Sequence, residues 1–435
     1  MHLSKDESNY FKINMFKEDT LLILGAGASH DYGFPTGEEL IKNILSTEGT
    51  IMVGNSPIRG GNKTNILNSV KKDIEKHFGI IAAIELSYID KINSSYQRFI
   101  KNRYSSDEII AEVTTGCNAP TDRVVGYISA YIEILGFFHK LEEFDPISID
   151  FFLSLHKEFN IELKDSDSRK GFEFNIGKYA IAHEIHGILS CMEKTINAEK
   201  KKGGNSSWYK YILTKLLQDC QREIEEIKHN KLSVITFNYD TSLEVFLKNR
   251  LSKMNHFNYE TDNGIKNYAE EFVTDFIENN IFHVYGKIEL GKDDKENTLE
   301  QSQHIDVIDR NNNGDGGKYK KIIEKSRNIY IIGYGFDDAN NDLIGLKNVF
   351  SIKTGSFNYR SGKYIQDIGL KNNVTLLNHN NSKIINKKIQ KYIYDNIMND
   401  KSGVEYFDID LSRIHNLTIT EKPISEAIGS DFDFS

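Results

Sequence analysis

The sequence predicts an α/β protein in which helices cover a doubly wound parallel sheet. Short apolar runs typical of buried strands recur at 21–24, 232–237 and 328–332. Helical patterns separate these runs, which is the order expected of parallel strands joined by crossover helices. A long, mainly helical stretch, residues 50–230, lies between the first two runs, and we interpret it as an insertion into the sheet domain.

Length and composition describe an ordinary globular protein. The 435 residues, 39% hydrophobic and 27% charged, can form one large domain with insertions or two domains. The net charge of −9 gives no reason to expect general affinity for nucleic acid or an anionic membrane. No apolar run approaches the roughly 18 residues that span a bilayer, and the polar N-terminus is unlike a signal peptide. We therefore expect a cytoplasmic protein.

The first strand is followed by a loop and then by the helical region. A helix is expected over Gly37–Leu45, with Thr36 as its N-cap. A loop at 49–63 precedes helices at 80–84, 124–141, 179–191 and 205–227.

Strands return in the second half of the chain. They are expected at 232–237, 281–286 and 328–332, with weaker ones at 349–352 and 374–377 and a helix at 384–398. We accordingly predict that residues 1–49 begin a Rossmann-like nucleotide-binding domain, 50–230 form a helical insertion capping its site, 231–400 complete the domain, and 401–435 form a C-terminal segment with an acidic tail.

The turn after the first strand is the first candidate binding site. In Gly25-Ala26-Gly27-Ala28-Ser29 the glycines permit a sharp turn, and backbone amides can face an anion such as a pyrophosphate. The turn departs from the dehydrogenase fingerprint, because His30 stands where a third glycine is expected. It is not a P-loop either, since no Gly-Lys-Ser/Thr follows. A second stiff loop, Gly33-Phe34-Pro35-Thr36-Gly37, comes next.

Together these loops resemble the entry loop of the sirtuin-like proteins, specifically the bacterial branch that consumes NAD. Three later segments match motifs of that family in the same order: Thr236-Phe237-Asn238-Tyr239-Asp240, His283-Val284-Tyr285-Gly286 and Gly333-Tyr334-Gly335-Phe336. The histidine motif departs from the family pattern, because two residues separate His283 from the glycine.

The resemblance implies a role for each matching residue. Asn238 would orient the attacked ribose or the water, Asp240 would support the ribose or the loop, and His283 would be the catalytic histidine. The remaining candidate NAD-binding residues are Gly25, Ala26, Gly27, Ser29, Gly33, Phe34, Pro35, Thr36, Gly333, Tyr334 and Gly335.

These residue types suit cleavage of the bond between nicotinamide and ribose C1′. Nicotinamide leaves as a neutral group that needs no proton, so the paired carboxylates of ordinary glycosidases are unnecessary. The amide of Asn238 can hold a water and a hydroxyl without adding charge, and the imidazole of His283 can accept a proton. Taken singly, such an asparagine is usually a turn residue and such a histidine a core group. The ordered set of five motifs favours the functional interpretation.

The cysteines separate the two branches of the family. Protein-deacylating sirtuins carry a zinc ribbon of two Cys-x-x-Cys pairs, whereas this chain has only Cys117, Cys191 and Cys220. We therefore expect no metal and favour hydrolysis of NAD to ADP-ribose and nicotinamide. An NAD-dependent deacylase or ADP-ribosyltransferase, and a non-catalytic NAD or ADP-ribose sensor, remain alternatives.

The resemblance also implies a biological setting. Members of this branch deplete NAD as effectors of abortive infection in bacterial anti-phage defence. It suggests activation by homo-oligomeric assembly or by a partner, either a HerA-like ATPase or an Argonaute-type protein. Direct binding to nucleic acid or to a membrane is not expected.

Overall fold

The computed structural model divides the chain into two compact units. The described residues are 16, 18–46, 51–53, 56–58, 63–78, 92, 95–96, 106–115, 122–163, 172–198, 208–217, 229–253, 258–261, 264–290, 298–306, 316–353, 358–360, 363–365, 369–377, 382–398, 411–422, 424 and 427. The first unit draws on Met1–Tyr32, Glu193–Val284 and Arg310–Ser435, and the second on Gly33–Met192 and Tyr285–Asp309.

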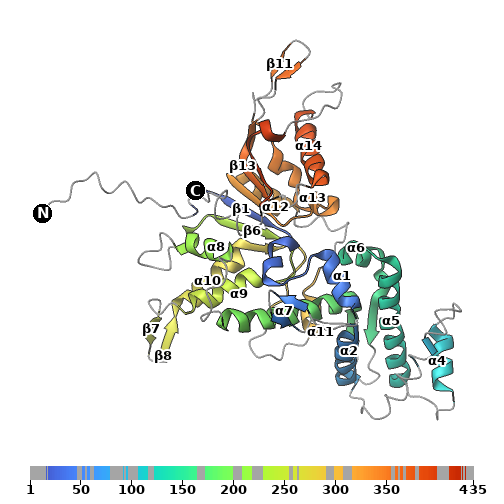
Figure 1. Cartoon of the computed structure of the whole chain (residues 1–435). Helices are drawn as coiled ribbons and strands as arrows, with labels where there is room; N and C mark the ends of the chain where they lie inside the picture. Colours follow the sequence, from blue (N-terminus) through green and yellow to red (C-terminus); the bar gives the residue numbers. More distant parts are fainter. Residues whose placement is uncertain are drawn as a thin grey trace. The chain divides into compact units, whose positions relative to one another are not determined.

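A six-stranded, fully parallel sheet forms the core of the first unit (Figure 1). Its strands, in spatial order, are β14 (His415–Thr420), β13 (Gly369–Leu377), β10 (Asn328–Ile332), β1 (Thr20–Leu24), β6 (Leu232–Thr236) and β9 (Ile281–His283). Helices flank this sheet, so the predicted α/β class with a Rossmann-like parallel sheet is confirmed.

The strand order reverses between β1 and β10. From β1 the chain continues to β6 and β9 on one side, and then to β10, β13 and β14 on the other. In open α/β sheets, ligands bind beyond the carboxyl ends of the strands near such a switch point. Leu24 is in register with both Ile332 and Thr236, so the loops after β1, β10 and β6 leave the sheet at the same level.

Burial explains which strands the sequence reveals. Every residue of β1 and β10 is buried, which is why they appear as continuous apolar runs. The strand predicted at 349–352 is wrong, because Leu346–Phe350 form the 3-10 helix η8. A short apolar run does not distinguish a strand from a buried helical turn. The edge strand β14 is not predicted, since most of its side chains are polar and partly exposed.

Among the described residues, the α-helices that lie wholly in the first unit are α8 (Trp208–Leu217), α9 (Ser242–Leu251), α10 (Tyr268–Asn280), α12 (Gly316–Lys325), α13 (Asp338–Ile344) and α14 (Lys383–Met398). It also contains the short hairpins β7 (Asn258–Thr261) with β8 (Gly264–Asn267), and β11 (Asn358–Arg360) with β12 (Lys363–Ile365). The helices predicted at 384–398 and 205–227 are present as α14 and, within the described residues, as α8.

The second unit is mainly helical. It contains α1 (Gly37–Leu45), α2 (Lys63–Phe78), α4 (Ser106–Thr114), α5 (Asp122–Phe144), α6 (Ile149–Leu155), most of α7 (Ile176–Ala198) and α11 (Thr298–Gln303). Two hairpins accompany them, β2 (Ile51–Val53) with β3 (Ser56–Ile58) and β4 (Asn160–Leu163) with β5 (Phe172–Asn175).

The limits of this unit differ from the predicted insertion at 50–230, because it begins at Gly33 and excludes α8. The helices expected at 124–141 and 179–191 are present as α5 and α7, whereas 80–84 lies outside the described residues. Among the helices that the structure describes, none combines the length and apolar character needed to cross a membrane.

Candidate active site

Two glycine loops cross at the switch point, where their backbones touch. The N–H of Gly25 donates to the carbonyl of Ile332 at 3.0 Å, and that of Gly27 donates to the carbonyl of Gly333 at 3.1 Å. A Cβ atom on Gly25 would lie 2.5 Å from the Gly333 oxygen, and one on Gly333 would overlap the Ala28 nitrogen. Gly333 also has a φ of +61°, which other residues rarely adopt. Close packing thus gives these glycines a structural reason that the sequence argument had not included.

The rest of the loop after β10 divides into a packed residue and an open one. Tyr334 is buried against Phe237, with ring centroids 4.9 Å apart, and its hydroxyl donates to Oδ1 of Asn341 at 2.9 Å. A Cβ atom on Gly335 would meet no atom within 4 Å among the described residues. Of the candidates in this loop, Gly335 is therefore the one with space beside it.

A chain of buried hydrogen bonds joins Asn238, Ser29 and Asp240. The Ser29 hydroxyl donates to Oδ2 of Asp240 at 2.8 Å. Because its single proton is used there, the Ser29 oxygen must accept from Nδ2 of Asn238, at 3.2 Å. This order fixes the orientation of the amide. Oδ1 of Asn238 is then buried with no hydrogen-bond partner among the described residues, a situation that is rare in native proteins and calls for an explanation.

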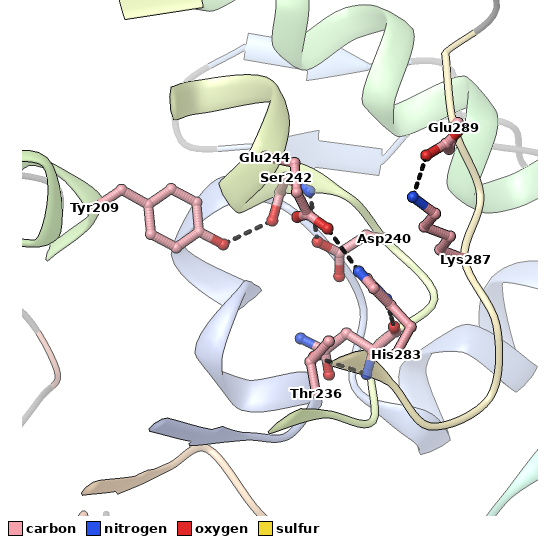
Figure 2. Close-up of polar contacts among 9 residues, drawn as sticks. Tyr209, Thr236, Asp240, Ser242, Glu244, His283, Lys287 and Glu289 are labelled. Carbon is pink, nitrogen blue, oxygen red and sulfur yellow. Dashed lines mark hydrogen bonds and ion pairs between the residues drawn. The ribbon is translucent and has the colours of Figure 1, made fainter. Parts of the chain in front are cut away.

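Asp240 anchors this chain to the start of α9. Its Oδ1 accepts from the Ser242 N–H at 3.1 Å, and the hydroxyl of Ser242 lies 2.6 Å from that of Tyr209 (Figure 2). Burial raises the pKa of Asp240, although the hydrogen bonds from Ser242 and Ser29 offset part of this effect. The carboxyl group thus connects the loops after β1 and β6 to α9, and the Ser242 hydroxyl connects α9 to α8.

His283 lies at the end of β9 with both ring nitrogens engaged (Figure 2). Its Nδ1 donates to the main-chain carbonyl of Asn238 at 2.9 Å, and its Nε2 lies 2.6 Å from Oε1 of Glu244. Burial alone would lower the pKa of His283, but the carboxylate of Glu244 and the two hydrogen bonds outweigh burial and raise it above 6.5. The structure therefore brings the predicted residues Asn238 and His283 together, through the main chain of Asn238.

Sequence reasoning missed three residues that contact this network. Glu244 is buried in the first turn of α9, although its position four residues after Asp240 suggested only a helix. Trp208 donates from Nε1 to the carbonyl of Ala28 at 2.9 Å, and Tyr209 stacks on Tyr32 with centroids 3.9 Å apart. The adjacent aromatic pair at the start of α8 was the only available signal, and it equally fits an ordinary core.

The second predicted loop belongs to the second unit. Gly33 has a φ of +89°, Phe34 is buried, and Pro35 is partly buried. The Glu39 carboxylate accepts from both the N–H and the hydroxyl of Thr36 at 2.8 Å, so α1 begins at Gly37 as predicted.

Comparison with known proteins gives no match. No protein-family model matches the chain, and a search of curated proteins finds no match. Within the described part of the chain, no group of three or more histidine, cysteine, aspartate or glutamate side chains is arranged to hold a metal ion. What the geometry defines is a Rossmann-like sheet with a buried polar network at its carboxyl edge.

Proposed function

We propose that this chain hydrolyses NAD⁺ to ADP-ribose and nicotinamide, and that the network around Asn238 is the active site. The observation that carries the proposal is the buried Oδ1 of Asn238, which has no hydrogen-bond partner among the described residues. It lies just beyond the carboxyl end of β6, where ligands bind in sheets of this kind. A ribose hydroxyl or a water molecule can donate to this oxygen and satisfy it.

The network suits Asn238 to this task. Its amide donates to Ser29, whose hydroxyl donates to Asp240, so Oδ1 is held at one place and its acceptor strength is increased by the acceptors on the other side of the amide. Water adds to ribose C1′, nicotinamide leaves with the electron pair of the broken bond, and one proton is released to solvent. His283 supports this geometry as a donor to the Asn238 carbonyl. The sequence argument expected His283 to accept a proton. In this arrangement neither of its nitrogens has an open lone pair for that role.

The proposal is tested by measuring nicotinamide release from NAD⁺ by the wild type and by Asn238→Ala. We expect a loss of about 100-fold or more, the typical effect of removing one preorganised hydrogen-bond group. Asn373→Ala is the matched control. Asn373 lies on β13 of the same sheet and is in register with Asn328, the first residue of β10, so it lies away from the carboxyl ends of the strands. A wild type that releases no nicotinamide under any condition would overturn the proposal, and NAD⁺ binding without release would favour the non-catalytic sensor.

Binding can be followed without turnover. Trp208 is the only tryptophan of the chain, and the hydrogen bond from its side chain to the Ala28 carbonyl places its ring beside the loop after β1. We expect its emission to change on titration with NAD⁺. An unchanged emission together with no calorimetric heat would argue against NAD⁺ at this loop.

We further propose that the enzyme acts as an abortive-infection effector in bacterial anti-phage defence, switched on by self-assembly or by a partner. The support is the ordered set of motifs, and the candidate partners are a HerA-like ATPase or an Argonaute-type protein. Nicotinamide release should therefore be measured over a series of protein concentrations and with each purified partner. Loss of cellular NAD⁺ during phage infection that Asn238→Ala prevents would support this role. Protection that Asn238→Ala leaves intact would favour a non-catalytic sensor.

A further inference from the structure

We infer that Glu244 is a positioning residue that holds His283 as a double hydrogen-bond donor and thereby fixes Asn238. The inference rests on the hydrolase proposed above and adds a residue to its machinery. Glu244 lies on α9, His283 on β9 and Asn238 after β6, so the pair ties three separate elements together.

The two partners of the ring decide how many protons it carries. A carbonyl oxygen only accepts, so Nδ1 of His283 must carry the proton that it donates to Asn238 at 2.9 Å. Nε2 faces a carboxylate oxygen at 2.6 Å, at the short end of the distances found for charge-assisted hydrogen bonds. With Glu244 ionised, Nε2 must also be protonated, so the ring is an imidazolium. A free Nδ1 or Nε2 lone pair is absent in this arrangement.

Burial makes this pairing obligatory. The side chains of His283 and Glu244 are 5% and 7% exposed, and removal of either partner would leave the other charge poorly solvated. Among the described residues, the charged side chains that act on the ring are Glu244 from α9 and Asp240 from the loop after β6. Both are acidic, so the surroundings favour the imidazolium. Glu244 also lies in the first turn of α9, where the helix dipole favours a carboxylate.

The hydrogen bond from His283 to the Asn238 carbonyl also restrains the Asn238 side chain. The Asn238 N–H donates to the Thr236 hydroxyl at 3.1 Å, so both main-chain groups of this residue have partners. With the backbone held on both sides, Oδ1 keeps its direction when substrate binds. Loosening the carbonyl would allow the peptide to rotate and move Oδ1 away from the reacting ribose.

The test uses Glu244→Gln and Glu244→Ala, with Glu324→Gln, exposed on α12, as the control. Glutamine can donate to Nε2 and leave the Nδ1 bond in place, so it removes the charge and keeps the shape. The first readout is ¹⁵N NMR of protein labelled at histidine, with the His283 signal assigned from its loss in His283→Asn. We expect two protonated nitrogens at neutral pH in the wild type and in Glu324→Gln, and only Nδ1 protonated in Glu244→Gln.

The second readout is the pH profile of nicotinamide release. The alkaline limb should be lost or strongly weakened in Glu244→Gln. In the wild type, a ring that has lost its Nε2 proton faces the Glu244 carboxylate, whereas glutamine can donate to the deprotonated Nε2 and keep the Nδ1 bond to Asn238 in place. Glu244→Ala should lose activity at all pH values. A singly protonated wild-type ring, or a Glu244→Gln profile identical to that of the wild type, would overturn the inference. A wild type that shows the doubly protonated ring but no NAD⁺ hydrolysis would refute the proposed function and leave the pairing established.

Discussion

Ser29→Ala is the sharpest test of the buried network, because one hydroxyl makes both of its links. The substitution removes the 2.8 Å bond to Asp240 and the 3.2 Å bond from Asn238. Hydrogen bonds to charged groups contribute about 1.5–3 kcal/mol and neutral ones about 0.5–1.5 kcal/mol, so we expect a loss of about 2–4.5 kcal/mol in unfolding free energy. The upper part of this range applies because Asp240 and the Asn238 amide would stay buried without their partner.

The assay is urea-induced unfolding followed by the emission of Trp208, which lies in the first unit beside the loop that carries Ser29. Ser326→Ala is the matched control. Ser326 is also buried in the first unit, but its hydroxyl donates only locally, to the carbonyl of Ile322 at 2.7 Å. We expect a loss of about 1 kcal/mol there. Equal losses in the two variants, with equal denaturant slopes, would refute the account of the network given above.

Three further predictions concern the frame around the site. Gly333→Ala should destabilise the first unit by about 1–3 kcal/mol in urea unfolding, because of its φ of +61° and the overlap with Ala28, whereas Gly335→Ala, which has open space, should change it by less than about 1 kcal/mol. The pKa of His283 is raised on folding, so its contribution to stability is complete below about pH 6.5 and is lost as the pH rises through the folded-state value; unfolding curves from pH 6 to 9 should show this decline, and His283→Asn should abolish it. Asp337→Ala should cost about 1 kcal/mol in the same assay, because Asp337 caps α13 by accepting from the N–H groups of Ala339 and Asn340 at 3.0 and 3.1 Å; no loss would mean that solvent replaces the cap.

The sequence predicts the parts of the fold that follow from local patterns. The inner strands β1 and β10 are buried on both faces, so their apolar runs identify them without further information. The edge strand β14 lacks such a run, because it is only partly covered. Its place in the sheet depends on pairing with β13, which no local pattern encodes.

The same distinction applies to the candidate site. Asn238 and Asp240 follow a strand directly, and parallel strands bring such positions to one edge, so their proximity to the loop after β1 could be predicted. The partner of His283 could not, because Glu244 is one of many glutamates in helices and only the packing of α9 turns it inward. Burial of both side chains is the reason why we propose a hydrogen-bond donor role for the histidine, where the sequence argument expected a proton acceptor.

The position of β1 in the middle of the sheet has a consequence for how the chain folds during synthesis. Its neighbours come from far along the polypeptide, with Thr20 in register with both Leu232 and Asn328. On the ribosome, β1 must wait for β6 and β10 to be made before its two sides are covered, and such distant pairing slows folding. Ser29 can reach Asp240 only after the 211 further positions up to Asp240 have been added to the chain. A nascent chain therefore cannot assemble the polar network early in synthesis.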